Sequence, residues 1–281
     1  MRYQTVVSSE VLLNHLPDPG WVVVDCRFAL SDPEAGRRAY HAGHISGAHY
    51  AHLDQDLAGQ VSERSGRHPL PDADAFRRLV GRWGVTPKTQ VVAYDDAGGA
   101  MAARLWWLLR WLGHRDVAVL DGGWQRWQAL GLPVVVTEPV EMPSRYPDLG
   151  RGQAWLTSAQ VAEALDAHAI LLLDARAQER FAGRDEPIDP VAGHIPGALN
   201  RPFQHNLDGK GRFKPPAMLA QEYEALLGPR GPAEVVHMCG SGVTACHNLL
   251  AMEHAGLAGS RLYPGSWSEW LRDPARPLIS R

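Results

Sequence analysis

Short apolar runs alternate with segments of helical periodicity along the chain. The runs have the length of buried strands, and the helical segments carry apolar residues three and four positions apart. Strands that alternate with helices favour an α/β fold in which a parallel sheet has helices on both faces. We expect strands at residues 22–24, 91–94, 117–120, 171–174 and 235–238, and helices at residues 75–83, 100–112 and 242–255.

Four segments of the sequence occur twice and in the same order, which indicates a duplicated domain. We therefore expect an N-terminal domain at residues 1–137, a proline-containing linker at residues 138–153 and a C-terminal domain at residues 154–281. The repeated pairs are VVDCR (23–27) with LLDAR (172–176), GHISGA (43–48) with GHIPGA (193–198), VVAYD (91–95) with VVHMC (235–239), and GGWQRW (122–127) with GSWSEW (265–270).

A cysteine lies at the carboxyl end of the predicted strand at residues 235–238. The sequence CGSGVTA (239–245) places Cys239 in a glycine-containing loop that leads into a helix. Ligands bind at this end of the strands in such sheets. Gly240 and Gly242 allow backbone N–H groups to converge, and a helix start adds roughly half a positive charge. We therefore expect Cys239 to be a thiolate nucleophile rather than a core residue.

The equivalent loop of the first copy carries no cysteine. Asp95 follows the strand there, at the start of the sequence DDAGG (95–99). A carboxylate thus occupies the place of the thiol. We expect the C-terminal domain to be catalytic and the N-terminal domain to be inactive.

The loop CGSGVTA, the two Gly-His-Ile-X-Gly-Ala segments and DGGW (121–124) together resemble the two-domain rhodanese family of sulfurtransferases. The resemblance covers nearly the whole chain and implies tandem rhodanese-like α/β domains. It implies that a sulfane sulfur moves from a small donor, through a Cys239 persulfide, to a thiol or cyanide acceptor without a cofactor. The neutral Gly240-Ser241 pair resembles the members that use 3-mercaptopyruvate, because thiosulfate-specific members carry basic residues after the cysteine.

The same resemblance assigns roles to further residues. Arg180 matches the arginine that binds the donor carboxylate, a task suited to a guanidinium group. Ser241 matches a hydroxyl that protonates the leaving enolate, with His68 and Asp54 of the first copy as its relay across the domains. The remaining donor-binding residues implied are in the loop: Gly240, Gly242, Val243 and Thr244.

One position departs from the 3-mercaptopyruvate enzymes of the family. They carry a second arginine shortly after a Glu-Pro pair, but here Glu186-Pro187 is followed by Ile188 and Asp189. Arg184 and Arg201 are the two candidates for the missing positive charge.

Composition and charge limit the classes of binding partner that we expect. With 28 Lys and Arg against 31 Asp and Glu, the net charge is −3, so neither nucleic acid nor an anionic membrane is expected. Three cysteines without a CxxC pair predict no disulfide framework, and the HxxH spacings at His41 and His49 lack the further ligands of a metal site. The first residues do not read as a signal peptide, so we expect a cytoplasmic protein, and two domains that pair within one chain suffice as a monomer.

Three other functions fit part of this pattern. A thiosulfate:cyanide sulfurtransferase differs only in its donor, and a persulfide carrier differs only in serving a protein acceptor. A cysteine-dependent phosphatase also binds an anion in a loop after a strand, but it needs an arginine six positions after the cysteine, where this chain has Ala245.

Overall fold

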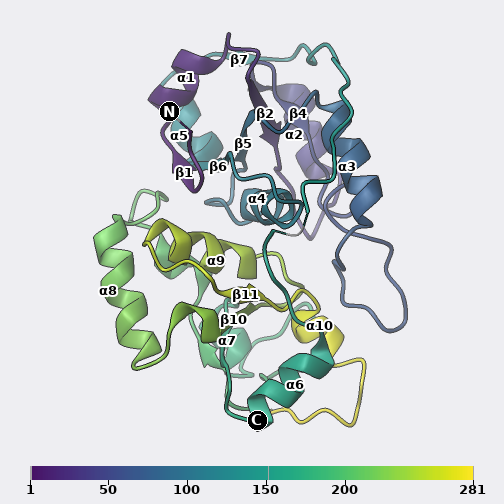
Figure 1. The fold of residues 1–281 in the computed structure, drawn as a ribbon, viewed down its shortest axis with the longest axis vertical. Coiled ribbons are helices and arrows are strands. Elements are labelled where there is room, and N and C mark those ends of the chain that lie inside the picture. Colours follow the sequence, from purple (N-terminus) through teal and green to yellow (C-terminus); the bar gives the residue numbers. More distant parts are fainter. Residues whose placement is uncertain (1, 151, 281) are drawn as a thin grey trace. The chain divides into compact units, whose positions relative to one another are not determined.

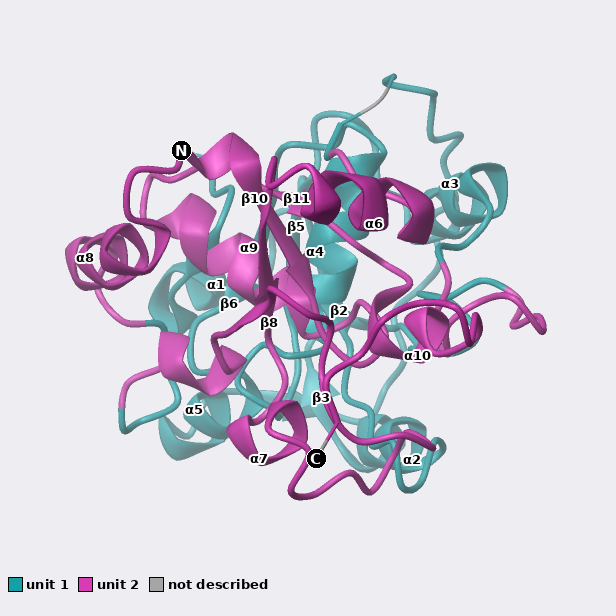
Figure 2. Cartoon of the chain, turned by 90° about the horizontal axis from the view of Figure 1, so that it is seen from below, with its two compact units in different colours: residues 1–59, 70–153, 209–213 teal, residues 60–69, 154–208, 214–281 magenta. Residues whose placement is uncertain are grey.

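The computed structural model describes residues 2–150 and 152–280. It contains two compact units, each built on its own parallel sheet (Figure 1). Figure 2 shows unit 1, with residues 1–59, 70–153 and 209–213, and unit 2, with residues 60–69, 154–208 and 214–281. Each unit therefore includes one short segment whose neighbours in the sequence belong to the other unit.

The sheet of unit 1 has five parallel strands in the order β1-β6-β5-β2-β4. Helices α1 and α5 share one buried apolar cluster with one face of this sheet, and the buried helix α4 contacts β5 and β6 outside that cluster. The elements are β1 (Val6–Val7), α1 (Ser9–His15), β2 (Trp21–Asp25), α2 (Ala35–Ala42), β3 (His44–Ile45), β4 (His49–Tyr50), α3 (Ala73–Arg82), β5 (Gln90–Tyr94), α4 (Ala102–Trp111), β6 (Val117–Leu120), α5 (Gly123–Ala129) and β7 (Val134–Val135), the last antiparallel to β3.

The sheet of unit 2 has four parallel strands in the order β11-β10-β8-β9. Helices α6 and α10 pack on one face, where Val236 and Met238 of β10 point, and α9 packs on the other with α8 behind it. The elements are α6 (Ser158–Asp166), β8 (Leu171–Asp174), α7 (Gln178–Phe181), β9 (Leu199–Asn200), α8 (Pro216–Leu227), β10 (Val235–Met238), α9 (Ala245–His254), β11 (Arg261–Leu262) and α10 (Ser266–Trp270), with 3-10 turns at Phe203–Asn206 and Pro232–Glu234.

The predicted α/β class, a parallel sheet with helices on both faces in each copy, is confirmed. One boundary differs in a way that matters for the site, because α9 begins at Ala245 and not at residue 242. Gly242 has φ +76°, in the left-handed region, and a Cβ there would lie 2.4 Å from the carbonyl oxygen of Pro264. Residues 240–244 therefore stay outside the helix as a loop.

The repeated sequence segments build the same buried cluster in each unit. The arginine of each cluster donates to an aspartate at a strand end and to a glycine carbonyl, and it lies over a tryptophan ring. These contacts indicate that the repeated residues stabilise the fold and do not take part in catalysis. The members are Arg27, Asp25, Gly43 and Trp124 in unit 1, and Arg176, Asp174, Gly193 and Trp267 in unit 2.

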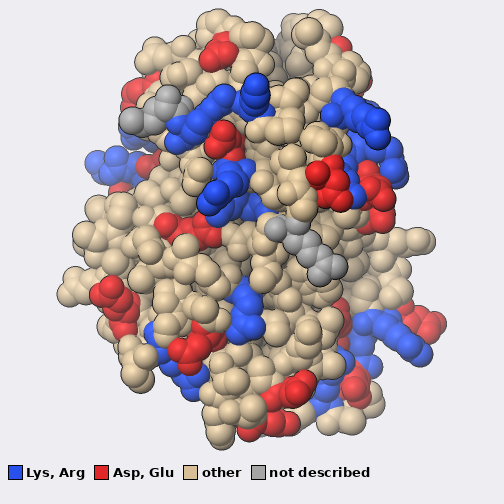
Figure 3. All heavy atoms as spheres, in the orientation of Figure 1, with Lys and Arg blue, Asp and Glu red and all other residues tan. Residues whose placement is uncertain are grey.

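No helix in the described part of the chain combines the length and the apolar character needed to cross a bilayer. Basic and acidic side chains are interspersed over the face that Figure 3 shows, which agrees with the small net charge of −3.

Candidate functional site

The thiol of Cys239 lies in a loop held by backbone and serine contacts. Cys239 is only 2% exposed, and the N–H of Gly242 donates to its Sγ at 3.1 Å. The N–H of Cys239 donates to Ser266 Oγ at 3.0 Å, and the N–H of Ser268 donates to the carbonyl of Gly240 at 2.9 Å. The start of α10 therefore fixes the loop, and a backbone dipole is directed at the sulfur.

Three further amide N–H groups of this loop donate to no acceptor in the part of the chain that the structure describes, whereas four amides of the equivalent loop in unit 1 donate to a carboxylate. Within the described residues, the N–H groups of Val243, Thr244 and Ala245 have no hydrogen-bond acceptor. In unit 1 the buried carboxylate of Asp95, which follows β5, accepts from four amides of its own loop at 2.7–2.8 Å: those of Ala97, Gly99, Met101 and Ala102. Burial raises the pKa of Asp95 although these four bonds lower it. The loop type therefore accommodates an anion, and in the first copy that anion is part of the chain.

A histidine from residues 60–69 reaches this loop. His68 Nδ1 lies 2.7 Å from Ser241 Oγ, and both side chains are buried. The N–H of Arg67 donates to Ser268 Oγ at 3.1 Å, and a Cβ on Gly66 would lie 2.7 Å from the carbonyl oxygen of Gly265. The close approach of the segment to α10 thus requires glycine at position 66.

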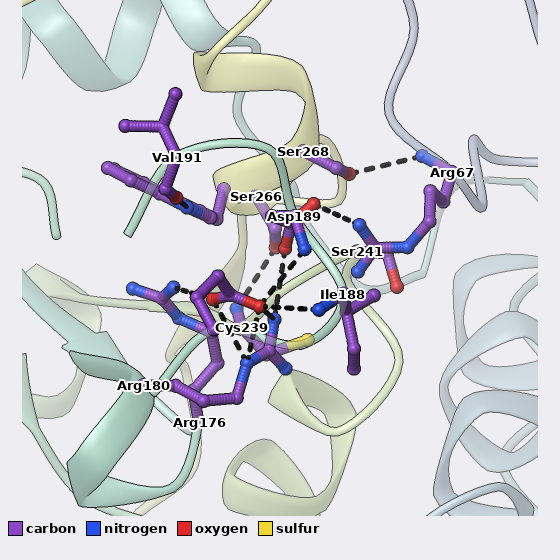
Figure 4. Close-up of polar contacts among 12 residues, drawn as sticks. Arg67, Arg176, Arg180, Ile188, Asp189, Val191, Cys239, Ser241, Ser266 and Ser268 are labelled. Atoms are coloured by element: carbon purple, nitrogen blue, oxygen red, sulfur yellow. Dashed lines mark hydrogen bonds and ion pairs between the residues drawn. The ribbon is translucent and has the colours of Figure 1, made fainter. Parts of the chain in front are cut away.

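Two arginines converge beside the loop, and Asp189 bridges them (Figure 4). Arg180 Nη2 lies 2.9 Å from Asp189 Oδ2, and Arg67 Nη1 is paired with Asp189 Oδ1. Arg180 Nε also donates to Glu186 at 3.0 Å. Burial alone would raise the pKa of Glu186, but the hydrogen bond from Arg180 and its charge lower it.

Gly240 allows both guanidinium groups to approach the loop. A Cβ at this position would lie 2.9 Å from Arg67 Nη2 and 3.5 Å from Arg180 Nη2. Since these nitrogens carry positive charge, they favour the binding of an anionic group close to the cysteine.

The structure brings most of the expected site residues together within unit 2: Cys239, Ser241, His68, Arg180, Gly240, Gly242, Val243 and Thr244. Asp54 belongs to unit 1, so its part in a relay stays a prediction. The two candidates for the missing arginine charge are engaged elsewhere. Arg184 pairs with the exposed Glu179, and Arg201 pairs with Glu222.

Arg67 was missed by sequence reasoning. Its neighbour His68 was singled out by the resemblance, but the direction of the Arg67 side chain depends on how residues 60–69 dock on α10. Asp189 marked a departure from the family pattern without revealing which groups it contacts.

The described residues contain no cluster of three or more His, Cys, Asp or Glu side chains that could hold a metal ion. The cysteines Cys26, Cys239 and Cys246 are buried and not bonded as disulfides.

Known proteins resemble the chain along its full length. The family model of the rhodanese-like domain matches residues 8–130 and 157–273. A probable 3-mercaptopyruvate sulfurtransferase of Pseudomonas aeruginosa is 48% identical over 282 residues, covering 100% of this chain and 99% of its own. Bovine thiosulfate sulfurtransferase is 32% identical over 99% of this chain and 96% of its own. The structure of 3-mercaptopyruvate sulfurtransferase from Leishmania major matches with a TM-score of 0.83 and 31% identity, covering 95% of this chain and 74% of that one. The chain therefore belongs to the rhodanese family of sulfurtransferases, as a tandem pair of rhodanese-like domains.

Proposed function

We propose that the protein transfers sulfur from 3-mercaptopyruvate through a persulfide on Cys239. The thiolate attacks the donor sulfur, an S–S bond forms, and the C–S bond breaks with its electron pair on the leaving enolate carbon. Protonation of that carbon gives pyruvate. An acceptor thiol then attacks the outer sulfur and leaves with it, which restores the Cys239 thiolate, and cyanide leaves as thiocyanate in the same way. Both steps are substitutions at sulfur and need no cofactor.

The observation that carries the proposal is the N–H of Gly242 directed at Cys239 Sγ within a loop that has further open amides. Such a loop stabilises the thiolate and, after transfer, the anionic outer sulfur. Asp95 supports this reading, because it fills the related loop of unit 1 with a carboxylate. We accordingly propose the C-terminal domain, residues 154–281, as catalytic and the N-terminal domain, residues 1–137, as inactive.

Proton transfer to the enolate is assigned to Ser241, with His68 at 2.7 Å as its proton partner. Asp54 is proposed to orient His68. Arg180 is proposed to bind the donor carboxylate, with Gly240, Gly242, Val243 and Thr244 around the reacting sulfur. A cytoplasmic location and a monomeric state stay predictions.

Cys239→Ser tests the nucleophile. After exposure to 3-mercaptopyruvate, the unaltered protein should gain about 32 Da per added sulfur, and the variant should gain nothing and turn over no donor. Cys26→Ala is the matched control, since Cys26 is an equally buried thiol at the end of β2, and it should keep the mass gain. Persulfide formation in Cys239→Ser would exclude this cysteine as the nucleophile.

The donor is tested by kcat/KM for 3-mercaptopyruvate and for thiosulfate on one preparation. A higher value for 3-mercaptopyruvate is expected. Thiosulfate is the second candidate, because the two guanidinium groups above Gly240 also suit a sulfonate. A clear preference for thiosulfate would reverse the choice of donor and leave the persulfide chemistry unchanged.

A further inference from the structure

The arginine pair above Gly240 is built from two distant parts of the sequence. Arg180 belongs to α7, whereas Arg67 comes from residues 60–69 (Figure 4). The side chain of Asp189 is 2% exposed and contacts both guanidinium groups, one with each carboxylate oxygen. A carboxylate of the chain thus lies between the two groups that face the catalytic loop.

The other charged side chains near the loop already have ionic partners within the chain. Arg176 is paired with Asp174 and Glu186 and lies over the ring of Trp267. Arg180 has Glu186 as a second partner. By contrast, within the described part of the chain the Arg67 side chain pairs only with Asp189, through Nη1, and its Nη2 has no hydrogen-bond partner. Arg67 therefore retains hydrogen-bonding capacity for a further anionic group.

The position of Arg67 places that capacity over the reacting residue. Its Nη2 is the nearest atom to a Cβ built on Gly240, at 2.9 Å, and Gly240 is the neighbour of Cys239. A donor whose sulfur meets Cys239 carries its carboxylate a few bonds away, within reach of this guanidinium. A second positive group also strengthens the binding of a carboxylate, since charge-assisted hydrogen bonds are about twice as strong as neutral ones.

Asp189 sets the charge of the pair. Arg67 and Arg180 carry two positive charges, and Asp189 with Glu186 carries two negative charges, so the four side chains together are neutral. At neutral pH 3-mercaptopyruvate carries one negative charge, because its thiol is mostly protonated, whereas thiosulfate carries two. A neutral set of side chains disfavours the dianion more than the monoanion.

We propose that Arg67 is the second arginine that binds the donor carboxylate, and that Asp189, by bridging Arg67 and Arg180, selects donors with one negative charge. The inference rests on the proposed function. It assigns to residues 60–69 the positive charge that the family pattern places after Glu186-Pro187.

Arg67→Gln tests the first part, with Arg64→Gln as the matched control because Arg64 is an exposed arginine of the same segment. The donors are 3-mercaptopyruvate and mercaptoacetone, which lacks the carboxylate. Arg67→Gln should lower kcat/KM for 3-mercaptopyruvate by about 10- to 100-fold, mainly through KM, and change that for mercaptoacetone by less than about twofold. Arg64→Gln should change neither, and Arg67→Lys should restore part of the loss.

Equal losses with both donors would show a structural role and overturn the inference. So would a loss in Arg67→Gln no larger than that in Arg64→Gln. If the unaltered protein forms no persulfide with 3-mercaptopyruvate, it is the proposed function that fails. Persulfide formation from mercaptoacetone also shows that each variant is folded.

Asp189→Asn tests the second part, since it keeps the shape of the side chain and removes its charge. The ratio of kcat/KM for thiosulfate to that for 3-mercaptopyruvate should rise about tenfold. An unchanged or lower ratio would overturn the role of Asp189 in selecting the donor.

Discussion

At the scale of single residues, the contact between Ser241 and His68 is expected to matter for one donor and not for the other. The enolate that leaves 3-mercaptopyruvate needs a proton, whereas the sulfite that leaves thiosulfate does not. Ser241→Ala should therefore lower kcat with 3-mercaptopyruvate about 100-fold and leave kcat with thiosulfate nearly unchanged. Steady-state rates with the two donors, measured with cyanide as the common acceptor, check this. Equal losses with both donors would mean that Ser241 shapes the loop instead of supplying a proton.

The proximity of site residues was predictable where it depends on local sequence. Cys239, Ser241 and the two loop glycines lie in one short motif, so their proximity follows from the chain itself. The contact of Arg67 with Asp189 joins positions 122 residues apart, and no local pattern records it. Arg184 and Arg201 were natural candidates by sequence distance, yet acidic neighbours engage both.

At the scale of elements, residues 60–69 form one segment that places both Arg67 and His68 beside the cysteine loop. Gly66 permits this, because a side chain there would meet the carbonyl of Gly265 and the hydroxyl of Ser268. Gly66→Ala should displace the segment and lower kcat/KM for 3-mercaptopyruvate by at least about tenfold, since it disturbs donor binding and proton transfer together.

Gly209→Ala is the control for this variant, because a Cβ at Gly209 has no atom within 4 Å. Thermal melting of both variants shows whether the change is confined to the site. Full activity of Gly66→Ala would mean that the segment tolerates a shift, and that its docking on α10 is not required.

Elements with strong periodicity were predictable, and β8, β10 and β6 begin and end where the apolar runs do. Strands β1, β3 and β7 were not predicted, because two residues are too few to show a period. The start of α9 was placed three residues early because the apolar pattern continues through Val243, while the left-handed Gly242 keeps the loop out of the helix.

At the scale of the whole molecule, buried ionisable groups set how stability depends on pH. Burial lowers the pKa of His237 to about 3, whereas the unfolded chain binds that proton near 6.5. The unfolded state thus holds more protons between these values, and stability falls as the pH drops from 6.5 toward 3, by up to about 1.4 kcal/mol per pH unit. The lowered pKa of Glu186 acts in the same direction at more acidic pH, and the raised pKa of Asp95 opposes it.

His237→Gln should make this dependence shallower. Glutamine has no proton to gain, so the melting temperature of the variant should fall less between pH 6.5 and pH 5 than that of the unaltered protein. Calorimetry at matched ionic strength measures both slopes. Parallel slopes would show that His237 is not a main source of acid sensitivity.

Duplication was visible in the sequence because both copies keep the same arginine, aspartate and tryptophan cluster. The sequence does not show that residues 60–69 pack with unit 2 and residues 209–213 with unit 1. That placement depends on contacts between positions far apart in the sequence.

Residues 60–69 have a further consequence for the history of the chain. A gene fragment encoding only the second repeat would carry the nucleophile but lack Gly66, Arg67 and His68. The first repeat, which has Asp95 in place of the loop cysteine, thus encodes residues that pack in the second compact unit. On the proposed roles of Arg67 and His68, either repeat alone would lack part of the catalytic site, and this favours retention of both halves of the duplication.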